Sequence, residues 1–167
     1  MTSRDALQVL LDEREIRGVI YRYVHACDRL DADEMATVYH PGAHDEHGPL
    51  RGPESEFRPN VLEALRVAYT FCSHTLGQSR IDFVNDDAAF VETYVIAATG
   101  RDVDGGEVVD LVGGRYVDRF ERRDGAWKVA DRIFAPDWDT QLPRERWQVP
   151  EQWTMGTRDR SDPSYSR

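Results

Sequence analysis

The side chains of this sequence that can carry proton-transfer chemistry without a cofactor are an imidazole, a carboxylate, a phenol and a guanidinium. His74 stands apart from the other four histidines, which all precede residue 48. A neutral imidazole suits a general base because its ordinary pKa lies near physiological pH. Asp28 can accept hydrogen bonds, Tyr23 can donate one, and Arg132 can stabilise a departing anion. These types can support an elimination, in which a base removes a proton and a hydroxide or halide leaves.

Each of these residues also has an ordinary structural explanation. A buried histidine can simply be satisfied by a carboxylate such as Asp28, because buried polar groups are normally paired. Tyr23 can be a core aromatic with a solvated hydroxyl. Arg132 can form an ion pair with a neighbouring Asp131 or Asp118. The residue types alone therefore leave both explanations open.

A second group of polar residues, between positions 40 and 47, has the side chains of a metal site. His40, His44, Asp45 and His47 carry atoms that can bind zinc or iron. If this segment is extended, however, His44 and His47 point to opposite faces, because side chains alternate along a strand. We therefore predict solvated or pocket-edge histidines and no metal site, with His44 as a candidate substrate contact.

The composition favours a soluble enzyme or binding protein for small molecules. The formal charge of -10, from 31 acidic and 21 basic residues, disfavours nucleic acid and anionic membranes. We find no apolar signal core and no apolar run long enough to span a bilayer. Cys27 and Cys72 have neither metal-ligand spacing nor the density of a disulfide framework, which predicts a reducing cytoplasm. We expect a small, mostly uncharged partner.

The first element that must position these residues is a helix from Asp12 to about Leu30. Asp12 followed by Glu15 resembles a capping box. Asp28 lies about 40° around the helix from Val24, on the border of the buried stripe, so its carboxylate can reach an enclosed space. The stripe itself comprises Ile16, Ile20, Tyr23, Val24 and Cys27.

The remaining elements describe helices followed by a mostly antiparallel sheet, which predicts an α+β fold. They are, in chain order, a helix from Asp33 to Tyr39, a strand from Ala43 to His47, a helix beginning near Pro59, and strands from His74 to Val84 and from Ala89 to Thr99.

A hairpin closes this series, with strands from Val108 to Arg122 and from Ala126 to Phe134. Its turn is Asp124-Gly125, a pair that favours the positive φ angles of a tight hairpin turn. The resulting register sets opposite charges and apolar residues face to face. The predicted pairs are Arg123 with Ala126, Glu121 with Lys128, Phe120 with Val129 and Tyr116 with Ile133.

The same register contains one conflict further along the hairpin. It would place Asp118 opposite Asp131 on the apolar face, and two like charges there are unfavourable. A β-bulge that re-aims one strand would remove the conflict. Such a bulge would also turn Arg132 inward.

We place the boundary of the single domain at residue 138 and assign residues 139–167 to a C-terminal tail. The tail is polar, is interrupted by prolines, and contains Trp147, Trp153 and Tyr165. Its composition is typical of a partly disordered terminus. Its large aromatics favour packing across a pocket mouth or on a neighbouring subunit.

Three segments of the sequence resemble the SnoaL-like branch of the nuclear transport factor 2-like superfamily. They are Ile20–Asp28, His74–Phe83, and Gly113–Tyr116 leading into Glu121–Lys128. The resemblance covers about residues 10 to 138. It implies a cone-shaped α+β barrel, in which a curved sheet wraps helices around a deep pocket, and a homotrimer.

Within this superfamily the chain is similar to cofactor-free lyases: hexachlorocyclohexane dehydrochlorinase, scytalone dehydratase and bile-acid 7α-dehydratase. The dehydrochlorinase pattern implies that Asp28 orients His74 as the base, and it matches Arg132 in the last strand. Tyr23 stands where the dehydrochlorinase has a lysine and the bile-acid enzyme a tyrosine. These residues would polarise the substrate or leaving group. We add the aromatic residues Tyr116 and Phe134 as substrate contacts.

The sequence also departs from these lyases. The additional aspartate of the bile-acid enzyme would fall near Ile96 or Ala97, and scytalone dehydratase's second histidine has no evident counterpart. The expected function is therefore a cofactor-independent lyase, such as a dehydratase, for a cyclic, largely apolar molecule such as a steroid, terpenoid or polyketide. A steroid-type double-bond isomerase and a non-catalytic binding module are the alternatives.

Overall fold

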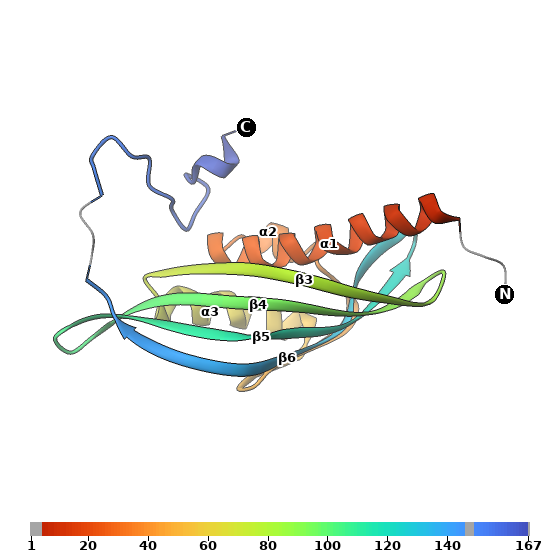
Figure 1. Ribbon diagram of the computed structural model, residues 1–167, viewed down its shortest axis with the longest axis horizontal. Helices are drawn as coiled ribbons and strands as arrows, with labels where there is room; N and C mark the ends of the chain where they lie inside the picture. The colour runs from red at the N-terminus through yellow and green to blue at the C-terminus, as the bar shows by residue number, and fades with distance from the viewer. Residues whose placement is uncertain (1–4, 146–148, 167) are drawn as a thin grey trace.

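A curved sheet of six strands wraps around the helices (Figure 1), which confirms the predicted α+β fold. The computed structural model describes residues 5–145 and 149–166. The sheet order is β2-β1-β6-β5-β4-β3, and its two edges do not meet. The elements are α1 (Ala6–Arg29), α2 (Ala32–Met35), β1 (Tyr39–His47), β2 (Leu50–Pro53), α3 (Glu54–Ala68), β3 (Phe71–Asn85), β4 (Ala88–Val103), β5 (Gly106–Arg123), β6 (Ala126–Pro143) and the short 3-10 helix η1 (Pro163–Tyr165).

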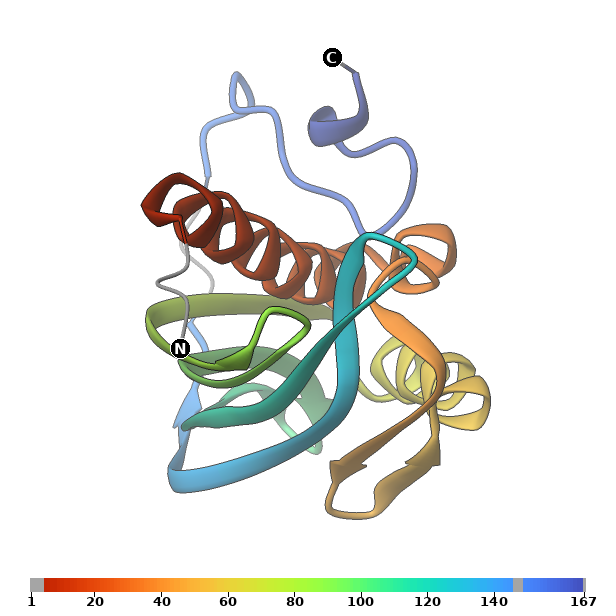
Figure 2. The same cartoon turned by 90° about the vertical axis from the view of Figure 1, so that its right-hand side faces the viewer.

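Helix α1 begins six residues before the predicted start. Its N-cap is Asp5, whose side chain accepts a hydrogen bond from the backbone N–H of Leu7. Asp12 is instead buried within the helix and accepts a hydrogen bond of 3.1 Å from the indole N–H of Trp127. The predicted capping box is therefore wrong, because the Asp12 carboxylate is used in a tertiary contact. Figure 2 shows α1 lying across the concave side of the sheet.

The second helix is shorter than predicted. Asp31, rather than Asp33, caps α2, and the helix ends at Met35. The chain is extended from Tyr39 onward because β1 pairs with β6, in the one parallel pairing among the described strands. Helix α3 begins at Glu54, so Pro59 lies inside it rather than at its start.

Near the turn, the β5–β6 hairpin has the predicted register. Glu121 pairs with Lys128 and Phe120 with Val129, as predicted. The register then shifts, which confirms the predicted bulge and places Asp118 opposite Arg132.

The shift also corrects one of the predicted pairs. Tyr116 pairs with Phe134 rather than with Ile133, because β6 contains one extra residue at the bulge. Strand β6 continues to Pro143, so the boundary placed at residue 138 falls inside a strand.

The core fills the space between the helices and the concave face of the sheet. Its fully buried side chains include Ile16, Phe57, Phe120, Trp127 and Val129. Among the described residues, no helix is both long enough and apolar enough to cross a membrane.

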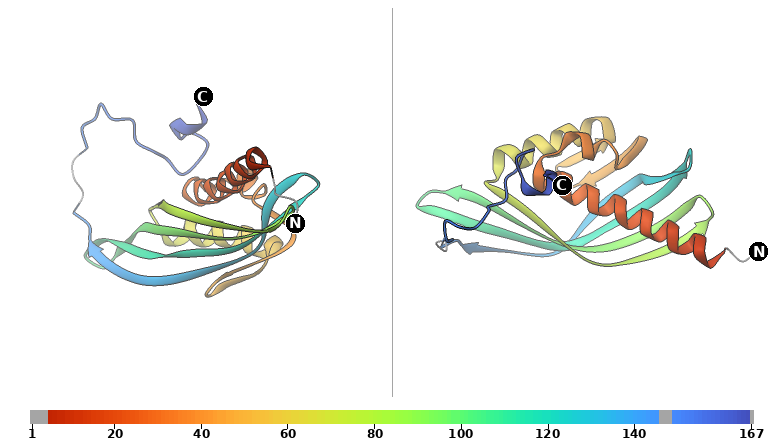
Figure 3. Two further views of the ribbon diagram at one scale, coloured as in Figure 1. Left: turned by 45° about the vertical axis from the view of Figure 1, so that its right-hand side comes forward. Right: turned by 90° about the horizontal axis from the view of Figure 1, so that it is seen from above.

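The C-terminal segment 149–166 returns to the end of α1 (Figures 1 and 3). Arg29 forms an ion pair of 2.9 Å with Asp162, and the hydroxyl of Tyr165 donates to the carboxylate of Asp31 over 2.7 Å. Arg158 donates to the backbone carbonyl of Tyr69. This part of the tail is therefore packed on the domain, whereas Trp147 lies outside the described residues.

Candidate active site

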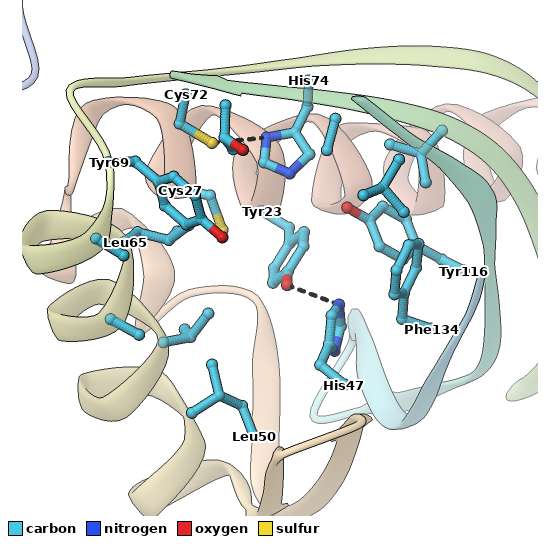
Figure 4. A pocket seen from close by; sticks show the side chains of 17 residues that line it. Tyr23, Cys27, His47, Leu50, Leu65, Tyr69, Cys72, His74, Tyr116 and Phe134 are labelled. Carbon is cyan, nitrogen blue, oxygen red and sulfur yellow. Dashed lines mark hydrogen bonds between the residues drawn. The ribbon is translucent and has the colours of Figure 1, made fainter. Parts of the chain in front are cut away.

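An apolar cavity of about 310 Å³ lies between α1, α3 and the concave face of the sheet (Figure 4). Most of its lining is aliphatic or aromatic. The polar side chains on its wall are Tyr23, Cys27, His47, Tyr69, Cys72, His74, Thr99 and Tyr116. A second hollow, of about 650 Å³, shares His47, Tyr69, Val112 and Phe134 with the cavity and continues past the β1–β2 turn. We take the shared residues as the mouth of the cavity.

His74 lines the cavity and Asp28 contacts this histidine from outside the lining, although 46 residues separate them. The Asp28 Oδ1 atom lies 2.7 Å from His74 Nδ1, and Oδ2 accepts the backbone N–H of His74 over 3.0 Å. Only 12% of the Asp28 side chain and 10% of the His74 side chain are exposed. A carboxylate accepts hydrogen bonds, so it favours the tautomer with the proton on Nδ1. The other ring nitrogen then carries a lone pair and points into the cavity (Figure 4).

Tyr23 projects from α1 into the centre of the same wall. Its hydroxyl lies 3.3 Å from Nε2 of His47 (Figure 4). Burial raises the pKa of Tyr23 well above its ordinary value, and the nearby Cys27 adds to this shift. The phenol therefore keeps its proton and can act as a hydrogen-bond donor.

His47 lines the cavity, whereas the sequence pattern placed it only among solvated or pocket-edge histidines and assigned it no role. Its Nδ1 atom forms a short hydrogen bond with Asp45 Oδ1, and its ring stacks on Phe134 with centroids 5.2 Å apart. The fully buried Asp45 also accepts a hydrogen bond of 2.6 Å from the hydroxyl of Tyr39. The i, i+2 spacing of Asp45 and His47 was the available signal, because it places both side chains on one face of a strand.

His44 occupies the opposite face of β1 and is exposed, outside the cavity lining. The prediction that His44 contacts a ligand there is therefore wrong, since the strand turns its odd-numbered residues inward. The alternation of His44 and His47 is confirmed. His40 Nε2 donates a hydrogen bond of 2.8 Å to the backbone carbonyl of Glu121, outside the cavity lining.

Arg132 lies inside the core and is not part of the cavity lining. Two hydrogen bonds of 2.7 and 2.6 Å join it to the Asp118 carboxylate, and both side chains are 0% exposed. Its guanidinium carbon lies 4.3 Å from the centre of the Tyr23 ring and 4.4 Å from that of Tyr116. Burial alone would lower the pKa of Arg132, but the Asp118 carboxylate raises it well above its ordinary value.

This arrangement corrects the predicted role of Arg132. The inward turn at the bulge brings the guanidinium to Asp118 rather than to the cavity. Arg132 can influence a ligand only through the aromatic rings that cover it. Tyr116 and Phe134, in contrast, line the cavity where we expected them, with ring centroids 5.8 Å apart. Their contact with a substrate stays a prediction.

The two cysteines line the cavity but are poor nucleophiles and poor metal ligands. Burial raises the pKa of Cys27 to about 12 and that of Cys72 further still. The donor atoms of Asp28, Cys72 and His74 lie within 4.8 Å of one another. However, the Asp28 carboxylate and His74 Nδ1 already bind each other, and Cys72 keeps its proton. The group fits an acid–base pair better than a metal centre.

The family follows from comparison with known sequences. The SnoaL-like domain family matches residues 8–133. This chain belongs to that family. The match covers both residues of the Asp28–His74 pair and most of the cavity wall. No curated protein matches the chain.

Several solved structures share the fold. Hexachlorocyclohexane dehydrochlorinase LinA-type3 from Novosphingobium barchaimii superposes with a TM-score of 0.78 and 19% identity, covering 87% of this chain and 100% of its own. A protein from Novosphingobium aromaticivorans, provisionally named a scytalone dehydratase, has a TM-score of 0.73 and 20% identity, with coverage of 90% and 100%. At such identities the likeness establishes the shared cone-like α+β fold and nothing finer.

A third solved structure carries a different name on the same fold. It is another protein from Novosphingobium aromaticivorans, provisionally named an aromatic ring hydroxylase, with a TM-score of 0.69 and 20% identity over 80% of this chain and 94% of its own. Function must therefore be argued from the side chains of the site.

Proposed function

We propose that this SnoaL-like protein is a cofactor-independent lyase that removes water from a cyclic, largely apolar small molecule. One observation carries the proposal. One ring nitrogen of His74 is held by Asp28 at 2.7 Å, while the other faces an apolar cavity. An oriented imidazole in such a cavity is suited to remove a proton from carbon.

In the proposed reaction, His74 Nε2 takes a proton from a carbon next to an electron-withdrawing group. The electron pair of the broken C–H bond forms the new double bond, and the carbon–oxygen bond on the neighbouring carbon breaks. Asp28 stabilises the imidazolium that forms, as a carboxylate does in other histidine-dependent sites. The Tyr23 phenol donates a hydrogen bond to the substrate, and the apolar walls exclude bulk water.

The cavity supports an uncharged substrate of modest size. Its volume of about 310 Å³ lies at the small end of the range for small-molecule sites. Glu46, Asp110 and Asp139 line the hollow beyond the mouth. Of these, Asp110 forms an ion pair of 2.6 Å with Arg101. Glu46 and Asp139 form no ion pair with another described residue, and such acidic groups disfavour an anionic substrate. A terpenoid, a polyketide or a steroid with little polar surface fits this description.

The names of two neighbours point in the same direction as the site. One is a dehydrochlorinase and the other is provisionally named a dehydratase, and both names describe eliminations. An isomerase that moves a double bond would use the same base and return the proton to another carbon. A binding module would hold its ligand without turnover. These alternatives differ from a lyase in the mass of the product.

Mass spectrometry with a panel of cyclic β-hydroxy ketones of one to four rings tests the proposal. We expect the wild type to produce a compound lighter by one water, and His74→Gln to lower kcat by about 10²-fold or more. His44→Gln is the matched control, because it removes an exposed histidine outside the cavity. Equal turnover by wild type and His74→Gln would remove the assignment. A product of unchanged mass would indicate the isomerase, and tight binding without turnover the binding module.

We also propose the homotrimer that the resemblance implies, in a reducing cytoplasm. The convex face of the sheet exposes Phe90, Ile96, Val117 and Ile133, and a face of this kind is suited to cover another subunit. Both cysteines are free and buried, which supports a reducing compartment. Light scattering coupled to size exclusion tests the assembly, and a monomer that persists at high concentration would contradict it.

A further inference from the structure

The cavity holds a second histidine–carboxylate pair that the base does not need. Asp45 Oδ1 binds His47 Nδ1, and Asp45 Oδ2 accepts the hydroxyl of Tyr39 over 2.6 Å. With both carboxylate oxygens occupied and the residue fully buried, the orientation of the His47 ring is fixed. Its other nitrogen, Nε2, then reaches the cavity wall beside the hydroxyl of Tyr23.

The two pairs approach the cavity from different strands. His74 projects from β3 and His47 from β1, with Tyr23 of α1 between them (Figure 4). One elimination needs only one base, so the second imidazole is available for another task. Loss of hydroxide from the substrate requires a proton donor, because hydroxide is a poor leaving group unless it is protonated as it departs.

We propose that His47 is the general acid that protonates the departing hydroxyl group, an inference that rests on the proposed lyase function. His74 Nε2 accepts the proton from carbon. His47 acts in its imidazolium form, in which both ring nitrogens carry a proton and Asp45 accepts from Nδ1 and stabilises the charge. The C–O bond breaks with its electron pair on oxygen, and the proton on His47 Nε2 moves to that oxygen to form water. His47 is left neutral and His74 protonated, and exchange with solvent restores both. The site is accordingly built for alcohols rather than for halides, which leave without a proton.

Other donors near the cavity are less suited to this step. Burial raises the pKa of Tyr23 well above its ordinary value, so its phenol holds its proton too tightly to release it and instead positions the oxygen. The guanidinium of Arg132 is committed to Asp118 and lies behind the wall. Of the described lining residues that are not already assigned, only His47 combines a buried carboxylate partner with an imidazole.

A purely structural His47 would satisfy the same contacts, because its ring also packs on Phe134 and lies 5.3 Å from the ring of Phe57. The test must therefore vary the leaving group while the carbon skeleton stays constant. β-Hydroxycyclohexanone and β-chlorocyclohexanone form such a pair, since both give cyclohexenone and their leaving groups are similar in size. Rates are corrected for the uncatalysed reaction.

We expect His47→Gln to lower kcat/KM for the hydroxy compound by about 10²-fold or more, and for the chloro compound by less than about 3-fold. His74→Gln should lower both by comparable factors. A similar loss on both compounds in His47→Gln would overturn the acid role and leave the base intact. If His74→Gln converts both compounds as fast as the wild type, the proposed lyase function is removed. The same holds if the wild type converts neither compound.

A measurement on the wild type alone keeps the inference testable if His47→Gln does not fold. The acidic proton exchanges with solvent, whereas the carbon-bound proton of the substrate does not exchange before the base removes it. Deuterium oxide should therefore slow water loss about 2-fold or more and leave chloride loss nearly unchanged. Equal solvent isotope effects on the two compounds would contradict proton donation by His47.

Discussion

Arg132 lies directly opposite Asp118 across the β5–β6 ladder, and the two side chains form a doubly hydrogen-bonded pair in the core. The aromatic rings of Tyr23 and Tyr116 cover the guanidinium, and both of these rings also line the cavity. The ion pair is therefore a support behind the cavity wall. It holds two wall residues in place without reaching the substrate.

Removing one partner of this pair should be strongly destabilising. We expect Arg132→Met to lower the free energy of unfolding by about 3–5 kcal/mol, because it leaves a buried carboxylate unpaired. The double variant Arg132→Met/Asp118→Leu should recover part of that loss. Urea denaturation measures both. Arg80→Met is the control, since Arg80 pairs with Asp82 at a surface where the side chains are 76% and 57% exposed, and it should cost less than about 1 kcal/mol.

Asp28→Asn should preserve the fold and impair the reaction. An asparagine can still accept the backbone N–H of His74, but it no longer fixes the tautomer or stabilises an imidazolium. We expect kcat to fall about 10²- to 10⁴-fold with little change in KM. Asp33→Asn, at a side chain that is 92% exposed, is the control. Turnover within about 2-fold of the wild type in Asp28→Asn would show that the pair is only structural.

The thiols that line the cavity should resist alkylation in the folded protein. Burial raises the pKa of Cys27 to about 12, so at pH 8 very little of the reactive thiolate is present. Cys72 is shifted in the same direction by its burial. We expect iodoacetamide at pH 8 to label neither residue within the time that labels both in urea, as measured by mass spectrometry. Rapid labelling of the native protein would contradict this expectation.

The C-terminal segment should stabilise the helix that closes one side of the cavity. Arg158 donates to the carbonyls of Leu65 and Tyr69, at the C-terminal end of α3, over 3.1 and 2.8 Å. Arg158→Met should therefore raise amide hydrogen exchange around residues 65–70 and lower stability by about 1 kcal/mol. Arg66→Met, on the same helix but in an exposed pair with Glu63, is the control. Unchanged exchange in Arg158→Met would show that the segment does not brace α3.

The sequence by itself determined the local features of this protein. The Asp124-Gly125 turn specified the hairpin register as far as Phe120 and Val129, because the turn residues and the alternation of side chains are local properties. The clash of like charges beyond that point indicated the bulge. The apolar stripe of α1 placed Tyr23 and the border residue Asp28 on one side of the helix, because helical periodicity is also a local property.

Only the tertiary structure decided which of these side chains meet. Strand alternation separates His44 from His47, but the pairing of β1 with β6 decides that His47 faces the cavity. The inward turn of Arg132 was foreseen, whereas its partner depended on the exact shift at the bulge. Contacts such as those of Arg158 join segments about 90 residues apart, and no local pattern encodes them. Packing around a shared cavity selects them when the whole chain folds.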